Sequence, residues 1–176
     1  MASYLLTPAR LSDAKRLAAM SQQWVEAGLR PSWGPLRIAW HIRDAESIVL
    51  TARVCGAAEG FAIMRYAEET AHLNLLAVSP AYRRRGMGRA LIGWLEETAL
   101  TAGTFAVSLE LRAGNTGARA FYAALGYQES AEVAGYYQGL ESAVRMRRDV
   151  RTQHQAPGAP RAAPDGRIRP PRADRS

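Results

Sequence analysis

The 176-residue chain is poor in cysteine, and Cys55 is the only one. A lone cysteine excludes an intrachain disulfide and fits a reducing compartment, so we expect the cytoplasm. His41, His72 and His154 have none of the spacings of metal ligands, and we therefore expect no metal site. No run of 18 apolar residues is present, which predicts no membrane span. Residues 1–4 also lack the basic and then apolar order of a signal peptide.

Lysine is equally scarce: Lys15 is the only one, and the other 22 of the 23 basic residues are arginine. So uniform a preference is more typical of genome composition than of selected contacts with nucleic acid. The formal net charge is +7, but residues 151–176 alone contain six arginines and two aspartates, a net charge of +4. Residues 1–150 therefore have a net charge of only +3, which makes nucleic acid an unlikely partner of this part.

Length and composition predict a single folded domain over residues 1–150, followed by a disordered tail over 151–176. The tail contains five prolines, two glycines and Ile168 as its only large apolar residue. It cannot bury enough apolar surface to offset the entropy lost on ordering. Binding of nucleic acid or of a membrane surface by this basic tail is the alternative hypothesis.

Hydrophobic periodicity and turn residues predict a mixed α/β or α+β domain built around one sheet. Strands are expected at 4–6, 47–54, 61–66, 71–78, 105–112, from 127 onward and at 143–150. Helices are expected at 12–28, with Ser12 as the N-cap, at 36–45, at 89–102 and at 115–125. Residues 136–140 are expected to form a loop before the last strand.

The most informative stretch is the loop between the strand at 71–78 and the helix at 89–102. Arginines and glycines gather there: Arg83, Arg84, Arg85, Gly86, Met87, Gly88 and Arg89. The first N–H groups of a helix lack partners and have partial positive charge, so they suit a phosphate. Glycines let an anion approach the backbone, and arginines add charge and hydrogen bonds. A solvated arginine cluster beside an ordinary helix start is the alternative.

Two common phosphate loops are excluded. The chain has no G-x-x-x-x-G-K-S/T, and Leu91 stands where a dinucleotide fingerprint needs its third glycine. The pattern Arg83-x-x-Gly86-x-Gly88, after a strand ending Leu-Ala-Val-x-Pro, instead resembles the acyl-CoA pyrophosphate loop of the GNAT N-acetyltransferase superfamily.

A second block strengthens this resemblance. Residues 109–115 (LELRAGN), Ala118 and residues 121–127 (FYAALGY) are similar to the family's L-E-V-R-x-x-N-x-x-A-x-x-x-Y-x-x-x-G-F segment. The resemblance is greatest to the RimI-type branch, which acetylates the N-terminal amine of a ribosomal protein. Tyr136-Tyr137 with the following residues 141–146 is also similar to that branch, whereas residues 20–46 show no match.

The resemblance implies a mostly antiparallel central sheet that splays between its fourth and fifth strands and is flanked by helices. It also implies acetyl-CoA as co-substrate, with the pantetheine arm lying between the splayed strands like an added strand. There the arm would meet backbone groups of Leu76, Ala77 and Val78. Asn115 would hydrogen-bond the arm, although capping the next helix is an equally physical role.

An amine acceptor requires a base, because it is mostly protonated at neutral pH and must lose a proton before it attacks a thioester. Glu110 matches the family's position for this base, acting directly or through water; an ordinary solvent-facing glutamate is the alternative. Tyr122 matches the position of a general acid for the departing CoA thiolate, and a half-buried packing tyrosine is the alternative. Cys55 has no histidine nearby in sequence, so a thiol nucleophile has little support.

The sequence thus predicts an acetyl-CoA-dependent N-acetyltransferase with direct transfer to an amine, foremost a protein N-terminal α-amine. The alternatives are acetylation of a small-molecule amine or a lysine side chain, or a non-catalytic acyl-CoA-binding module. A peptide acceptor predicts an open groove beside Tyr136 and Tyr137, and a small amine predicts a closed pocket. In the resembling family the first two helices shape the acceptor side of the site, which makes four aromatic residues possible substrate contacts: Trp24, Trp33, Trp40 and His41. Packing in the core is the favoured alternative for them. We expect a monomer or homodimer without a membrane partner.

Overall fold

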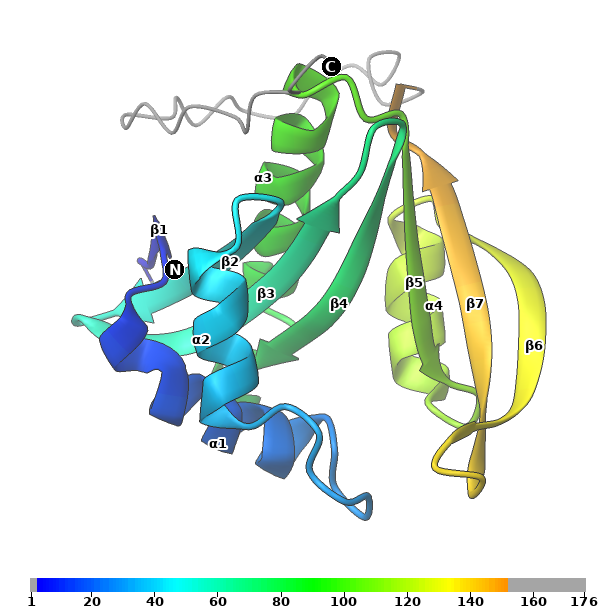
Figure 1. Cartoon of the computed structure of the whole chain (residues 1–176), viewed down its shortest axis with the longest axis horizontal. Coiled ribbons are helices and arrows are strands. Elements are labelled where there is room, and N and C mark those ends of the chain that lie inside the picture. The colour runs from blue at the N-terminus through cyan, green and yellow to red at the C-terminus, as the bar shows by residue number, and fades with distance from the viewer. Residues whose placement is uncertain (1–2, 152–176) are drawn as a thin grey trace.

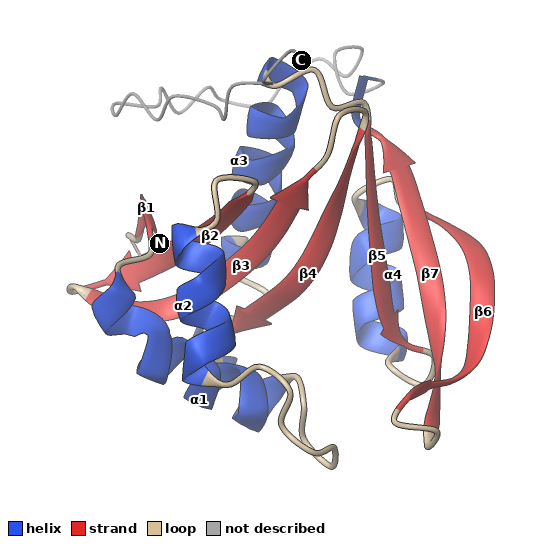
Figure 2. Cartoon of the chain, in the orientation of Figure 1, coloured by secondary structure: helices blue, strands red, loops and turns tan. Residues whose placement is uncertain are grey.

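The computed structural model describes residues 3–151 as a seven-stranded sheet with helices on both faces (Figures 1 and 2). The strands are β1 (Leu5–Pro8), β2 (Ser47–Val54), β3 (Ala57–Tyr66), β4 (Thr70–Val78), β5 (Ala106–Arg112), β6 (Gln128–Tyr137) and β7 (Glu141–Asp149). The helices are α1 (Ala14–Trp24), α2 (Pro35–Arg43), α3 (Met87–Thr101) and α4 (Thr116–Ala124), with short 3₁₀ turns at Leu11–Asp13 and Pro80–Tyr82. Apart from Arg151, the predicted tail lies outside the described residues. Within residues 3–151, no helix is long and apolar enough to cross a membrane.

The strand order is β1-β2-β3-β4-β5-β7-β6, and every neighbouring pair is antiparallel except β4 with β5. The exception follows from the connection, because the chain leaves β4, runs through α3 and returns as β5 in the same direction. Pairing of β4 with β5 extends only from Thr70 opposite Ala106 to Leu73 opposite Leu109. The predicted fold class, a mixed and mostly antiparallel sheet splayed between its fourth and fifth strands, is confirmed.

A β-bulge in β4 accompanies the splay. Ile63 of β3 pairs with Leu75, but its neighbour Met64 pairs with Leu73, which leaves Asn74 as an extra residue in β4. A bulge bends its strand and increases the local twist. Leu73, immediately before the bulge, is also the last residue of β4 that pairs with β5. Figure 1 shows the result: the two strands lie together at one end and separate toward the other.

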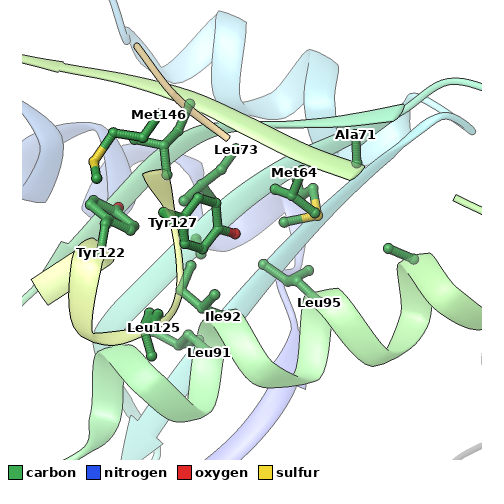
Figure 3. Close-up of a cluster of buried hydrophobic side chains, with 14 of the residues drawn as sticks. Met64, Ala71, Leu73, Leu91, Ile92, Leu95, Tyr122, Leu125, Tyr127 and Met146 are labelled. Atoms are coloured by element: carbon green, nitrogen blue, oxygen red, sulfur yellow. The ribbon is translucent and has the colours of Figure 1, made fainter. Parts of the chain in front are cut away.

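Helices α3 and α4 pack on one face of the sheet, and α1 and α2 pack on the other. The apolar stripe of α3, Leu91, Ile92, Leu95 and Ala99, is buried, as its helical spacing predicts (Figure 3). On the opposite face, Leu17 of α1 and Ile38 of α2 belong to a buried cluster with Phe61 and Ile63 of β3. The strand residues of the two clusters alternate between the faces, and those of the second cluster come only from β2, β3 and β4, so it is this half of the sheet that is covered from both sides.

A buried polar cluster joins α3 to the half of the sheet that contains β5, β7 and β6. Glu96 of α3 is 1% exposed, and its carboxylate accepts a hydrogen bond from the Tyr127 hydroxyl at 2.8 Å. The same carboxylate lies 3.0 Å from Nη1 of Arg148, in β7. Because α3 also packs on β2, β3 and β4, this cluster fixes the two halves of the splayed sheet relative to each other.

Three local predictions were wrong. Ser12 does not cap α1, because it lies inside the preceding 3₁₀ turn, where the Asp13 carboxylate accepts a hydrogen bond from Arg10 N at 2.7 Å. Helix α1 ends at Trp24, four residues before the predicted stop at Gly28. The segment predicted as a 136–140 loop begins with the last two residues of β6, and only residues 138–140 form the turn.

Arg148→Ala should lower the free energy of unfolding by about 3 kcal/mol, since it leaves the buried Glu96 carboxylate without this cation. Urea denaturation would measure the change. Arg147→Ala is the matched control, because Arg147 is the exposed neighbour on the other face of β7 and should change stability by no more than about 0.5 kcal/mol. Equal losses in the two variants would contradict the role given to the cluster.

Candidate functional site

The splay opens a cavity of about 490 Å³ between β4, β5, the α1–α2 loop and the β6–β7 turn. It brings together four residues that the sequence singled out and that are far apart along the chain: Leu76, Glu110, Asn115 and Tyr122. Figure 1 shows the α1–α2 loop and the β6–β7 turn at the end where β4 and β5 are apart. The cavity therefore lies where the sheet offers unpaired strand edges.

Glu110 is held in the cavity wall by two partners. Its Oε2 lies 2.9 Å from Nε2 of His72, its Oε1 lies 2.9 Å from Nε of Arg145, and its side chain is 10% exposed. The hydrogen bond from His72 is the main cause that holds the pKa of Glu110 below its usual 4.5; burial opposes it, and the Arg145 contact adds to it. Glu110 is thus an ionised, positioned carboxylate rather than an ordinary solvent-facing one.

His72 is the residue that the sequence analysis missed. It lies in β4 opposite Ser108 of β5, and its Nδ1 is 3.1 Å from the Ser108 hydroxyl. With Nε2 at Glu110, both ring nitrogens are engaged, so His72 orients Glu110 rather than presenting a free lone pair. The only sequence signal is its position on the polar face of an alternating strand. To connect it with Glu110, one must know how β4 and β5 align, and this pairing is not local in sequence.

Tyr122 also lines the cavity, but it is buried more deeply than predicted, at 7% exposed. Its ring lies against Phe121 and Tyr127 at centroid distances of 5.0 and 5.5 Å, beside Met146 in the core (Figure 3). Burial raises the pKa of Tyr122, so its hydroxyl stays protonated at neutral pH. Among the described residues that hydroxyl has no hydrogen-bond partner, which leaves its proton available to a ligand.

The basic loop leads directly into α3, which begins at Met87, two residues earlier than predicted. Gly86 is its N-cap with φ +85°, and Arg84 has φ +58°, so the loop turns sharply through left-handed conformations. The N–H groups that open α3 have no intrahelical partners, as a phosphate site requires. The Arg83 side chain has fewer donors left for a phosphate than expected, because its Nε donates to the Val78 carbonyl at 3.0 Å.

Two residues of this loop have roles in packing that the sequence did not suggest. The Met87 side chain is 1% exposed and belongs to the core, so only its backbone can face a ligand. A Cβ on Gly88 would lie 3.3 Å from the Phe121 ring, so this glycine permits the close approach of α3 and α4. Asn115 accepts a hydrogen bond from Ala118 N at 3.0 Å and caps α4, the second of its two expected roles.

The opposite end of the cavity is formed by the α1–α2 loop, which is organised around the buried Glu26. Its Oε1 accepts hydrogen bonds from N and Oγ of Ser32, at 2.6 and 2.7 Å. Trp24 and Trp33 pack with the cluster under α1 and α2 and also line the cavity, so both roles considered for them stay open. Trp40 and His41 do not line it, and His41 Nδ1 instead contacts the Ser47 hydroxyl at 2.9 Å.

The α1–α2 loop is bridged to the β6–β7 turn. The side-chain amide of Gln138 accepts from Arg30 N at 3.1 Å and donates to Arg30 O at 2.8 Å. A second link joins Arg112 Nη2 to the Ala27 carbonyl at 2.8 Å. The open groove predicted for a peptide acceptor is therefore spanned by hydrogen bonds between exposed groups, which can break at modest cost.

Comparison with known proteins gives relatives for the region that contains the site. The acetyltransferase (GNAT) family model matches residues 15–127. The ribosomal protein bS18-alanine N-acetyltransferase of Salmonella typhimurium is 39% identical over 89 residues, which are 49% of this chain and 60% of that protein. The N-terminal acetyltransferase B complex catalytic subunit naa20 of Schizosaccharomyces pombe is 38% identical over 66 residues, 38% of this chain and 37% of that protein.

The matched stretches thus span less than two thirds of these curated relatives. The crystal structure of the ribosomal-protein-S18-alanine N-acetyltransferase from Escherichia coli has a TM-score of 0.73 and 27% identity, and the match covers 84% of this chain and 94% of that one. Within residues 3–151, no three His, Cys, Asp or Glu side chains are grouped to hold a metal ion. By its family match, its splayed sheet and its basic loop before α3, the chain belongs to the GNAT acetyltransferase family.

Proposed function

We propose that the protein is an N-acetyltransferase that uses acetyl-CoA and transfers the acetyl group directly to the α-amine of a protein N-terminus. The observation that supports it most is that Glu110 and Tyr122, an ionised carboxylate and a protonated phenol, line one cavity at the splay. The names of two relatives describe action on protein N-termini. The lone, exposed Cys55 fits a protein of the cytoplasm.

Acetyl-CoA fits the residues along the splay. The pyrophosphate would lie on the first turn of α3, where Gly86 leaves space and the arginines of the loop add charge. The pantetheine arm would bind the edge of β4 beyond Leu73, which has no strand partner on the β5 side. Backbone groups of residues 76–78 would then hydrogen-bond the arm and polarise the thioester carbonyl.

Glu110 would accept the proton of the attacking amine, directly or through water. Its two partners leave lone pairs free on both carboxylate oxygens. A carboxylate with a lowered pKa is too weak a base to deprotonate a free ammonium, so it acts as the nitrogen gains positive charge during attack. Such a site favours α-amines, of which about a tenth are neutral at pH 7, over lysines, of which fewer than about one in a thousand are neutral.

Tyr122 would donate its proton, or a strong hydrogen bond, to the sulfur as the thiolate departs. Its raised pKa ensures that the phenol is protonated when the thioester arrives. Tyr122 follows Phe121, whose ring lies against Gly88 in the first turn of α3, so Tyr122 would act from the side of the proposed cofactor site. Base and acid would thus act from different walls of one cavity.

A small-molecule amine is the second candidate acceptor. The bridge between Gln138 and Arg30 supports it, because it encloses the end of the cavity where a peptide would have to enter. A peptide acceptor requires that the two hydrogen bonds open or that the chain passes beneath them.

Release of free thiol from acetyl-CoA would test the proposal. With peptides that have free N-termini, we expect turnover by the wild type and losses of roughly 100-fold in kcat for Glu110→Gln and for Tyr122→Phe. Glu129→Gln is the control for the carboxylate, since Glu129 is exposed and does not line the cavity. Turnover with small amines alone would assign the second acceptor, and CoA binding without any turnover would contradict catalysis.

The pKa of Glu110 should rise in His72→Ala. The hydrogen bond from His72 is the largest cause that lowers this pKa, so without it the carboxyl should titrate at a higher pH than in the wild type. In the wild type, the stability due to the ionised Glu110 is fully present above 4.5 and is lost as the pH falls through the lower folded value.

Carboxyl ¹³C NMR of glutamate-labelled protein would measure the titration. Arg145→Ala should raise the pKa of Glu110 less, because its hydrogen bond lowers that pKa less than the one from His72 does. A pKa of Glu110 that is the same in His72→Ala and the wild type would contradict the pairing.

Gly86→Val should raise the KM for acetyl-CoA about tenfold and leave the KM for the acceptor nearly unchanged. A β-branched residue cannot easily adopt φ +85°, so the first turn of α3 would shift and its N–H groups would lose their alignment. Gly93→Ala is the matched control in the middle of the same helix, where a Cβ meets no atom within 4 Å. Steady-state kinetics of both variants would decide; an unchanged KM for acetyl-CoA in Gly86→Val would contradict this site.

A further inference from the structure

Arg37 is a charged group at the acceptor end of the cavity for which the proposed mechanism has no use. It lies in the first turn of α2, is exposed to solvent and lines the cavity. Its guanidinium carbon is 3.9 Å from the centre of the Trp33 ring, and its Nη1 is 3.4 Å from the Ser32 carbonyl. A guanidinium that stacks flat on an aromatic ring keeps its edge free to donate to a second group.

The other charged side chains of the cavity wall already have partners. Glu110 is paired with Arg145, and Arg112 lies 3.3 Å from the Glu141 carboxylate. Glu26 accepts hydrogen bonds from the Ser21 hydroxyl of α1 and from the backbone and hydroxyl of Ser32. Across residues 3–151, no carboxylate lies within 4 Å of Arg37. Arg37 is therefore a preoriented cation without a counter-ion.

Arg37, Tyr136 and Glu110 all line this cavity, Arg37 from α2 and Glu110 from β5. Burial is the main cause that raises the pKa of Tyr136; the charge of Glu110 adds to the rise, while Arg145 and Arg37 oppose it. Tyr136 thus lies within the electrostatic reach of both Glu110 and Arg37. An acceptor whose amine is at Glu110 would extend past Tyr136 toward Arg37.

We propose that Arg37 determines acceptor specificity by binding a carboxylate that lies close to the reacting amine. This inference rests on the proposed function, which places the amine at Glu110. In a peptide acceptor the carboxylate would belong to an acidic side chain near the N-terminus; because an extended chain advances about 3.3 Å per residue, the second and third positions are the ones to test. The carboxylate of a free amino acid offers the same chemistry, and the experiment distinguishes the two sources.

The test compares acceptors that differ only in charge. Peptides with Asp or Glu in the second or third position are matched with their Asn or Gln counterparts, and glutamate is matched with glutamine amide. For the wild type we expect kcat/KM to be about tenfold higher for the acidic member of a pair, mainly through a lower KM, because a charge-assisted hydrogen bond to Arg37 would form. At about 0.5 M salt the difference should be smaller, because salt screens this interaction. The difference should disappear in Arg37→Ala and reverse toward basic acceptors in Arg37→Glu.

Arg43→Ala is the matched control, because Arg43 is exposed on the same helix but does not line the cavity. It should keep the preference of the wild type. A preference seen only with peptides assigns a peptide acceptor, and one seen only with amino acids assigns a small acceptor; both support the role of Arg37. Equal kcat/KM within every pair, or a preference that survives in Arg37→Ala, would overturn it.

The failure of the two proposals can be told apart. If the wild type acetylates none of these acceptors, the proposed function is contradicted. The affinity for the paired peptides, measured by calorimetry in the presence of CoA, then decides the question of Arg37 separately. Tighter binding of the acidic member that is lost in Arg37→Ala would support the inference, and equal affinities would overturn it.

Discussion

The separation of β4 from β5 after Leu73 is the constraint on which the rest of the structure depends. Parallel strands that stayed paired would satisfy each other's backbone groups and leave no cavity. The bulge at Asn74 interrupts this pairing, and the buried side-chain oxygen of Asn74 has no hydrogen bond. Unsatisfied buried groups are costly and therefore gather at functional sites, which fits a strand edge reserved for a ligand.

The two ends of the cavity differ in how their charged side chains are balanced. On the β5 side, His72 and Arg145 keep Glu110 ionised, so its charge is balanced before any acceptor arrives. On the α2 side, Arg37 is left without such a balance. A neutral amine at one end and a carboxylate at the other would match this pattern, and both charges are held by contacts within the wall rather than by flexible side chains alone.

Several residues serve the core and the site at once. The first N–H groups of α3 have no intrahelical partners, while Met87 and the stripe from Leu91 to Ala99 fill the core. Gly88 lets α3 approach Phe121 of α4, and the next residue of α4, Tyr122, lines the cavity. Because the same short segments serve both, changes that loosen the packing of α3 against α4 should also displace the groups that we propose bind the cofactor.

The sequence by itself determined the local elements and the family. The alternation of apolar and polar residues predicted β5, and the helical spacing of apolar residues predicted α3. Two spaced motifs identified the GNAT family and gave Glu110 and Tyr122 as the candidate base and acid. Only the tertiary structure decided which groups meet. The pairing of His72 with Glu110 depends on the alignment of β4 with β5, and the bridge from Gln138 to Arg30 joins residues 108 positions apart. Propensity and periodicity describe neighbours along the chain, whereas the charge state of a carboxylate and the free edge of a strand depend on contacts that form only when distant segments pack.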